Sequence, residues 1–511
     1  MKIKPIQLSL WAMLAVLLLA SCTRIPKYVK VIPADATVVM RIDVEQLAEK
    51  SGFGDDSKTK QKLTEALKEA DLSREAREKA EAILDDPAKA GLDLRSPVFV
   101  FAGEKDNNSY EGVVGEILDK DDFTQLLNAF AKESDIAQVK ESGNVSYFVQ
   151  DRTMIVFDKS YFYIGKRPYG QEAIDFVNEV AKKFESDGKN SMLESEHIKK
   201  ICASKGIAQL FINGKAIADL KDFKRAEGML PNGLKYEDIS YLYDLSAEKG
   251  EASLAMEVLP SSDAWKKQIA ESDKLVGKYS DDLLKYVSKD GFAMFVNMDI
   301  PGLLKMLKES ALWKEIDPAQ QKEFEEILTS IDGSLAFGIS DFYMEHGIPK
   351  LAAYFTTNSD KVVKMLAQNQ DDGEMKQTAG GYTLPLGYDT DLVQNFGYKD
   401  KVSYYLMDKT PAPFKEAANH FASGDLKGKG LYLYFNFDFL KKISNKLPAS
   451  EGKAAIDTAV KIFDKAELYY EGDGRMMLEV KTKDKEHTPI ESIIEFAFNY
   501  LDYQVVEETE Q

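Results

Sequence analysis

The sequence has little of the chemistry that metal centres and disulfide frameworks require. Of its 511 residues, only two are cysteine and four are histidine. Two cysteines exclude a disulfide framework and any metal site built from several thiolates. Basic residues are also in deficit, with 66 Lys and Arg against 85 Asp and Glu and a formal net charge of −19. We therefore expect no nucleic-acid partner, since phosphate binding needs a basic surface.

Apolar residues, in contrast, are abundant. They make up 44% of the chain, which is ample for packed cores and excludes global disorder. Because single cores stop growing at roughly 250–300 residues, a chain of this length is expected to form two to four domains.

The N-terminus carries an export signal. Lys2 and Lys4 precede an apolar run, Leu10 to Ala20, that is too short to span a bilayer comfortably as a helix. The run ends in Leu19-Ala20-Ser21-Cys22, which resembles the lipobox of bacterial lipoproteins. The resemblance implies a signal peptide over residues 1–21 and lipid attachment at Cys22, and more than one lipid chain gives stable anchoring. An ordinary signal peptide with a chance cysteine is the alternative.

The segment after the lipobox predicts which side of the membrane the protein faces. Residues 22–34 read as a lipid-anchored tether, and the first of them are basic rather than acidic. Surface-exported lipoproteins of Bacteroides-type bacteria tend to carry acidic residues there, so we expect an outer membrane lipoprotein on the periplasmic face. The other cysteine, Cys202, is expected to be a buried structural thiol.

A strand, an Asp or Asn, and then a helical segment recur four times. The β-rich runs are followed by residues suited to cap the next helix, and the four anchors are Ala36–Asp43, Gly206–Asn213, Gly291–Asp299 and Gly430–Asp438. Asp43 and Asp299 are 256 residues apart, and other matching positions keep the same order. Chance similarity is the alternative, but the shared order favours internal duplication.

The repeat predicts an α+β fold of tandem βαββα modules, close to a split-βαβ arrangement. We expect mixed or antiparallel sheets with helices on one face. The first half spans residues 35–279 with modules 35–180 and 205–279, and the second spans 280–503 with modules 280–422 and 428–503. Residues 504–511 form an acidic tail.

Motifs that carry chemistry are absent from the sequence. The four histidines are far apart, and Asp119-Lys-Asp-Asp122 lacks the Gly and Glu of a calcium loop, so helix capping explains it better. The Gly-rich stretch Gly424–Gly430 precedes a strand, whereas phosphate loops follow one, so a turn is favoured. We expect no catalytic residue, no metal ligand and no cofactor. The 24 tyrosines gather on predicted strands, where core packing is favoured over a binding face.

Two stretches resemble a known family. They are Ile32–Val39 and Ala90–Val100, and together with the lipobox and the length they are similar to Bacteroides-type lipoproteins catalogued as domain of unknown function 4836. The resemblance covers essentially the whole mature chain but implies no activity.

Together these features predict a non-enzymatic, lipid-anchored envelope protein that faces the periplasm and binds or scaffolds an envelope protein or a glycan. The alternative is an envelope hydrolase with a site in the cleft between the two halves.

Overall fold

A computed structural model describes residues 25–494 apart from short gaps at 54–57, 70–71, 106–107, 134–137, 219–226, 228–229, 231–233, 278, 280, 344, 369–374, 379, 388–389, 446 and 448–450. The predicted signal peptide, Cys22 and the acidic tail lie outside these residues. The chain divides into two compact units, one that ends at Asn213 and one that begins at Gly214.

The first unit contains an antiparallel sheet. Its described strands are β1 (Val38–Ile42), β2 (Val98–Lys105), β3 (Asn108–Glu116), β4 (Lys140–Ser142), β5 (Val145–Gln150), β6 (Thr153–Phe157), β7 (Tyr161–Lys166) and β8 (Ala208–Ile212). They pair in the order β4–β5–β6–β7–β3–β2–β1–β8. β1 therefore lies between β2 and β8, although β8 comes more than 160 residues later in the chain.

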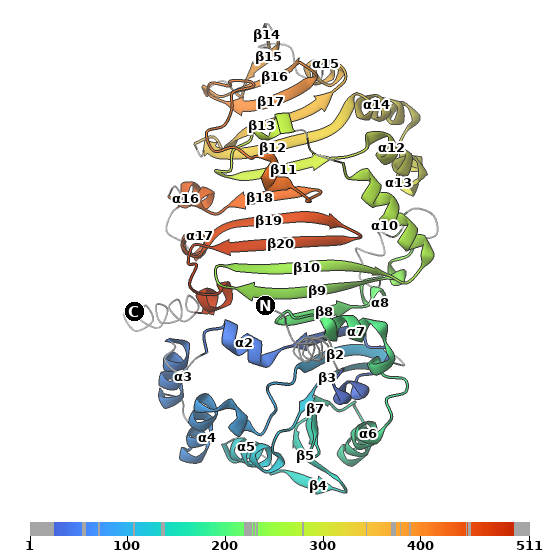
Figure 1. The fold of residues 1–511 in the computed structure, drawn as a ribbon, viewed down its shortest axis with the longest axis vertical. Helices are drawn as coiled ribbons and strands as arrows, with labels where there is room; N and C mark the ends of the chain where they lie inside the picture. The colour runs from blue at the N-terminus through green and yellow to red at the C-terminus, as the bar shows by residue number, and fades with distance from the viewer. Residues whose placement is uncertain are drawn as a thin grey trace, which may run out of the picture. The chain divides into compact units, whose positions relative to one another are not determined.

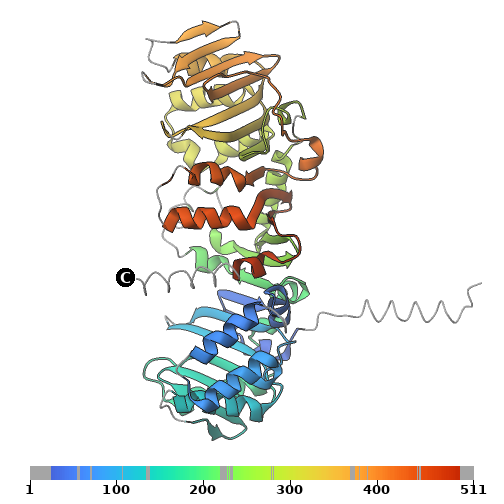
Figure 2. The same ribbon diagram turned by 90° about the vertical axis from the view of Figure 1, so that its left-hand side faces the viewer.

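Helices cover both faces of this sheet. Those described are η1 (Lys27–Val31), α2 (Val44–Lys50), α3 (Lys58–Glu69), α4 (Arg74–Asp85), η2 (Pro87–Ala90), α5 (Lys120–Glu133), α6 (Ala173–Glu185), η3 (Met192–Glu194) and α7 (Glu196–Ala203). On β7, Phe162 packs against Phe123 of α5, whereas Tyr163, which comes next, contacts Phe176 of α6. Neighbouring strand residues point to opposite faces, so α5 and α6 lie on opposite sides. Figure 2 shows the blue helices lying across one of these faces.

The second unit repeats the strand order of the first. Its described strands are β9 (Ile239–Glu248), β10 (Glu251–Pro260), β11 (Phe292–Asn297), β12 (Ile331–Tyr343), β13 (Ile348–Thr357), β14 (Lys376–Thr378), β15 (Gly381–Pro385), β16 (Val393–Lys399), β17 (Val402–Asp408), β18 (Tyr432–Asn436), β19 (Phe463–Gly472) and β20 (Arg475–Thr482). Pairing runs β14–β15–β16–β17–β13–β12–β11–β18 and continues through β19, β20, β10 and β9 (Figure 1). β11 therefore lies between β12 and β18, as β1 lies between β2 and β8.

An aromatic core lies on one face of this sheet. Phe295, Tyr354, Phe421 and Tyr432 are each exposed by 2% or less. The described helices are α8 (Gly214–Ala218), η4 (Tyr236–Asp238), α10 (Asp263–Leu275), α11 (Asp281–Leu284), α12 (Ile300–Glu309), α13 (Ala311–Glu315), α14 (Pro318–Leu328), α15 (Lys361–Gln368), η5 (Ser423–Leu426), α16 (Asp438–Ser444) and α17 (Glu451–Ile462).

The predicted fold class of tandem βαββα modules with helices on one face is wrong. The twenty described strands form long sheets in which every pairing is antiparallel. The predicted module 205–279 does not exist as a unit, because β8 pairs with β1 whereas β10 pairs with β20. Strand pairing between segments distant in sequence overrides the local βαββα pattern, and helices cover both faces in the first unit.

Tight hairpins join two pairs of strands in the second unit. One joins β9 and β10 at Gly250, and the other joins β19 and β20 near Gly474. Gly250 and Gly474 have φ of +74° and +73°, the left-handed conformation that glycine adopts without strain. The capping expected at Asp119–Asp122 is present, because Asp119 Oδ1 accepts from the backbone N–H groups of Asp121 and Asp122.

The described part of the predicted tether enters the core of the first unit. Tyr28, Val29 and Ile32 are fully buried. The Tyr28 hydroxyl donates to the carbonyl of Pro97, and its ring contacts Phe99 edge-on. From Tyr28 onward, the segment predicted as a tether (residues 22–34) is therefore part of the folded first unit.

Candidate functional site

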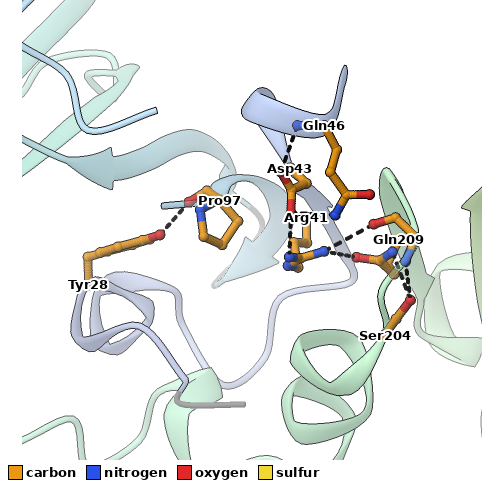
Figure 3. Close-up of polar contacts among 8 residues, drawn as sticks. Tyr28, Arg41, Asp43, Gln46, Pro97, Ser204 and Gln209 are labelled. Carbon is orange, nitrogen blue, oxygen red and sulfur yellow. Dashed lines mark hydrogen bonds and ion pairs between the residues drawn. The ribbon is translucent and has the colours of Figure 1, made fainter. Parts of the chain in front are cut away.

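The helix α2 is held by a buried polar network at the end of β1 (Figure 3). Arg41 is only 8% exposed and Gln209, its cross-strand neighbour on β8, is fully buried. Arg41 Nη1 donates to Gln209 Oε1 at 2.6 Å, and Arg41 Nη2 lies 3.2 Å from Asp43 Oδ2. Ser204 Oγ accepts from Gln209 Nε2 at 3.0 Å, so the amide is engaged at both ends. A buried guanidinium is stable only when it is paired in this way.

Asp43 connects this network to the start of α2. Its Oδ1 accepts from the backbone N–H of Gln46 at 3.0 Å, and its Oδ2 accepts from the Gln46 side chain at 2.9 Å. This is the N-cap that the sequence predicts. The network therefore fixes where α2 begins and how it leaves the sheet.

One wall of an open cavity is formed by α2. The cavity, called the α2 cavity below, has a volume of about 820 Å³. Its apolar lining comes from α2 and the residues just after it, from η2 and from the loops before β2 and after β3, and consists of Val44, Ala48, Phe53, Pro87, Ala88, Leu92, Leu94 and Leu118. None of the seven residues of α2 is buried, and Leu118 is 48% exposed. Apolar surface thus remains accessible in a concavity of the size that takes small ligands.

Charged groups lie at the rim of the α2 cavity. Glu45, Glu49, Asp93 and Arg95 line it beside the apolar residues. Arg95 Nε donates to Asp93 Oδ1 at 2.9 Å and Arg95 Nη2 donates to Asp93 Oδ2 at 3.2 Å. The Arg95 guanidinium lowers the pKa of the Asp93 carboxyl through these hydrogen bonds. Asp93 and Arg95 neutralise one another, whereas Glu45 and Glu49 are exposed.

A second cavity lies at the equivalent place in the second unit. This α12 cavity has a volume of about 560 Å³. Its helical lining positions each follow an α2-cavity position by 256 residues, in the pairs Val44/Ile300, Glu45/Pro301, Ala48/Leu304, Glu49/Lys305, Gly52/Lys308 and Phe53/Glu309. The cavity position therefore recurs with the strand order, while its side chains change in size and charge.

A third cavity, of about 670 Å³, lies within the second unit where the predicted halves meet. Asp273, Tyr279, Lys429 and Tyr470 contribute to its lining. Asp273 already accepts from the Tyr470 hydroxyl and from the backbone N–H of Asp473. Lys429 is paired with the buried Glu467. Burial would raise the pKa of the Glu467 carboxyl, but Lys429 and Lys465 outweigh it and lower the pKa to about 2. Asp273 and Lys429 are therefore both engaged, each with partners of its own.

The histidines and cysteines are not brought together. His197 stacks on Phe211, and His487 Nδ1 lies 2.7 Å from Asp484 Oδ2 in the other unit. Cys202 is buried as predicted, and burial raises its pKa to about 11. Among the described residues, no group of three or more His, Cys, Asp or Glu is placed to hold a metal ion. Cys22, the predicted lipid-attachment residue, lies outside those residues. No described helix is long and apolar enough to cross a bilayer.

Sequence reasoning identified Asp43 but missed the residues that line the α2 cavity. Their signal was weak, because Val44, Leu47 and Ala48 form only a short apolar stripe. Comparing the two halves at the spacing of 256 residues could have found them, since Glu49 and Lys305 differ in charge at matching positions.

Comparison with known proteins places the chain in a family. No curated protein matches it. Solved structures of TP0453 match at low similarity: crystal form I has 13% identity and a TM-score of 0.26 over 46% of this chain and 79% of its own. Crystal form III has 13% identity and a TM-score of 0.27 over 50% and 89%. The family model described as "Domain of unknown function (DUF4836)" matches residues 28–410, which include both the α2 cavity and the α12 cavity. The chain therefore belongs to the DUF4836 family.

Proposed function

We propose that the protein is a Bacteroides-type lipoprotein, held at the periplasmic face of the outer membrane by lipid on Cys22, that binds the aliphatic chain of an amphiphilic molecule in the α2 cavity. The lipobox-like Leu19–Cys22 and the absence of acidic residues directly after Cys22 support the anchor and its side. The open, apolar α2 cavity is the observation that carries the binding role.

An aliphatic chain suits this cavity better than the envelope protein or glycan expected from sequence. Eight of its lining residues are apolar, and of its four charged lining residues Glu45, Glu49 and Arg95 are exposed. A glycan would leave its hydroxyl groups against Val44, Leu92 and Leu94, where few hydrogen-bond partners are available. A hydrocarbon chain, in contrast, gains about 0.8 kcal/mol for each buried methylene.

The role is one of binding rather than catalysis. In the 670 Å³ cavity at the predicted junction of the halves, Asp273 is engaged with the Tyr470 hydroxyl and Lys429 with the Glu467 carboxylate. The described histidines line none of the three cavities. No observation therefore favours the hydrolase alternative over binding.

Titration of the purified protein with decyl maltoside below its critical micelle concentration tests the binding role. We expect saturable binding by calorimetry, with a Kd of roughly 10–100 μM once association costs are subtracted from chain burial. Ala48→Phe places an aromatic ring inside the cavity and should weaken binding at least tenfold. Leu47→Phe is the matched control, since Leu47 is an α2 residue outside the cavity lining. Absence of binding, or equal binding by Ala48→Phe, would contradict the proposal.

Two experiments test the anchor. Cys22→Ala should move the protein from the membrane fraction to the soluble fraction, and unchanged fractionation would refute lipid attachment.

Proteinase K added to intact cells should leave the wild-type protein uncut. Degradation without cell lysis would place it on the outer surface instead.

A further inference from the structure

The two equivalent cavities differ most in the charge at their rims. Glu49 of α2 corresponds to Lys305 of α12, and both side chains are exposed at the cavity edge. Gly52, with no side chain, corresponds to Lys308, and Phe53 corresponds to Glu309. The α12 cavity therefore balances Lys305 and Lys308 against Glu309 and Asp332, whereas the α2 cavity has Glu49 where its counterpart has Lys305.

The groups that face the α2 cavity leave a net negative rim. Three carboxylates, those of Glu45, Glu49 and Asp93, stand against the single guanidinium of Arg95. Arg95 is already bound through two hydrogen bonds to Asp93. Lys50 and Lys89 belong to α2 and η2 but do not line the cavity. A headgroup placed at the mouth would therefore meet the two carboxylates of Glu45 and Glu49.

We propose that the ligand of the α2 cavity is a cationic amphiphile, an inference that rests on the proposed function. Its aliphatic chain lies among Val44, Leu92 and Leu94. Its positive headgroup lies beside Glu45 and Glu49. An anionic headgroup would be repelled by both carboxylates. A neutral headgroup would gain no attraction from them. The α12 cavity, with Lys305 at the matching position, lacks this preference for a cation.

Three probes with the same ten-carbon chain test the proposal: decyltrimethylammonium, decyl maltoside and decanoate. Calorimetry is done on the wild-type protein and on Ala48→Phe. The difference between the two heats of binding gives the heat of binding in the α2 cavity. We expect the cation to bind roughly three- to tenfold more tightly than the neutral probe at low salt, and decanoate more weakly than either. The preference should shrink at 0.5 M NaCl, because salt screens exposed charges.

Charge reversal provides the matched variants. Glu49→Lys copies the residue of the α12 cavity and should abolish the preference for the cation over decyl maltoside. Lys305→Glu makes the opposite change in the other unit and should leave the α2 preference unaltered. Equal or tighter binding of decyl maltoside or decanoate by the wild type, or an unchanged preference in Glu49→Lys, would overturn the cationic ligand while leaving chain binding intact. Failure of all three probes would instead refute the proposed function.

Discussion

The β1–α2 segment of the first unit and the β11–α12 segment of the second occupy the same place in the strand order but are built from different chemistry. In the first, Arg41 of β1 is paired across the sheet with Gln209 of β8. In the second, the residue that follows Arg41 by 256 positions is Asn297, at the end of β11, and the last β11 residue paired with β18 is Phe295, opposite Tyr432. All four paired residues are 8% exposed or less. The same order of strands thus accommodates an ionic pair near the end of β1 and an aromatic pair two residues before the end of β11.

The helices that follow differ in what covers them. α2 ends at Lys50, and Gly52 follows it with φ of +69°. α12 continues through the matching position 308, where Lys308 forms an ion pair of 2.6 Å with Glu325 of α14. α12 also buries Ile300 and Leu304, whereas α2 buries none of its residues. Strand pairing therefore sets where the cavity lies, whereas helix length and cover set its volume, which is about 820 Å³ beside α2 and about 560 Å³ beside α12.

The largest effect on stability is expected from placing a buried arginine, like Arg41 of the first unit, in the aromatic core of the second unit. Phe295→Arg would bury a guanidinium against Phe421 and Tyr432, with no partner like Gln209, and should cost about 4–5 kcal/mol of stability. Urea denaturation measures the loss, and hydrogen exchange should localise it to β11. Phe295→Leu, an apolar control, should cost less than about 1.5 kcal/mol. A loss below about 2 kcal/mol for Phe295→Arg would show that the second unit can accommodate the charge.

The reverse exchange should cost less and be partly repairable. Arg41→Met leaves the Gln209 amide and the Asp43 carboxylate without the guanidinium, at a cost of about 3 kcal/mol. Arg41→Met combined with Gln209→Leu makes the pair apolar, like the neighbouring pair of Phe295 and Tyr432 in the second unit, and should recover about half of that loss. Denaturation of the single and double variants gives the coupling energy. Costs that simply add would show that the two side chains act independently.

The helix caps of the two segments should also differ in how much they contribute to stability. Asp43 accepts from the Gln46 backbone N–H, whereas Asp299 makes no side-chain hydrogen bond to the start of α12. Asp43→Ala should therefore cost about 1–2 kcal/mol and Asp299→Ala less than about 0.5 kcal/mol. Hydrogen exchange should show faster opening of α2 in the first variant only. Equal costs would mean that the Asp43 cap is not what holds α2.

Local features of this fold were predictable from sequence because short-range chemistry determines them. β-branched and aromatic runs marked β1 and β11, and Asp43 was recognised as a cap. Asp119 was likewise expected to cap a helix, and its carboxylate accepts from the backbone N–H groups of Asp121 and Asp122. Cys202 was expected to be buried because free cysteine behaves as a small apolar residue.

The pairing of distant strands was not predictable in the same way. The contact between β1 and β8 joins segments whose local patterns are satisfied equally by separate modules. Arg41 gives no sign of burial, since an arginine in a strand usually reaches solvent and becomes stable inside only because Gln209 and Asp43 meet it there. The α2 cavity depends on this placement, so its residues could not be assembled from sequence alone.

The smallest effect on stability, but a measurable one on binding, is expected from copying one methyl-branched side chain between the helices. Ala48→Leu gives α2 the residue that α12 carries as Leu304, and the open α2 cavity has room for it without backbone movement. Stability should change by less than about 1 kcal/mol, because the new side chain fills accessible space rather than a packed core. Decyl maltoside should nevertheless bind roughly three- to tenfold more weakly, since the leucine removes volume that the chain would occupy. Unchanged affinity would show that the ligand does not contact this wall of the cavity. A large loss of stability would show instead that the α2 cavity is packed as tightly as its counterpart beneath α12.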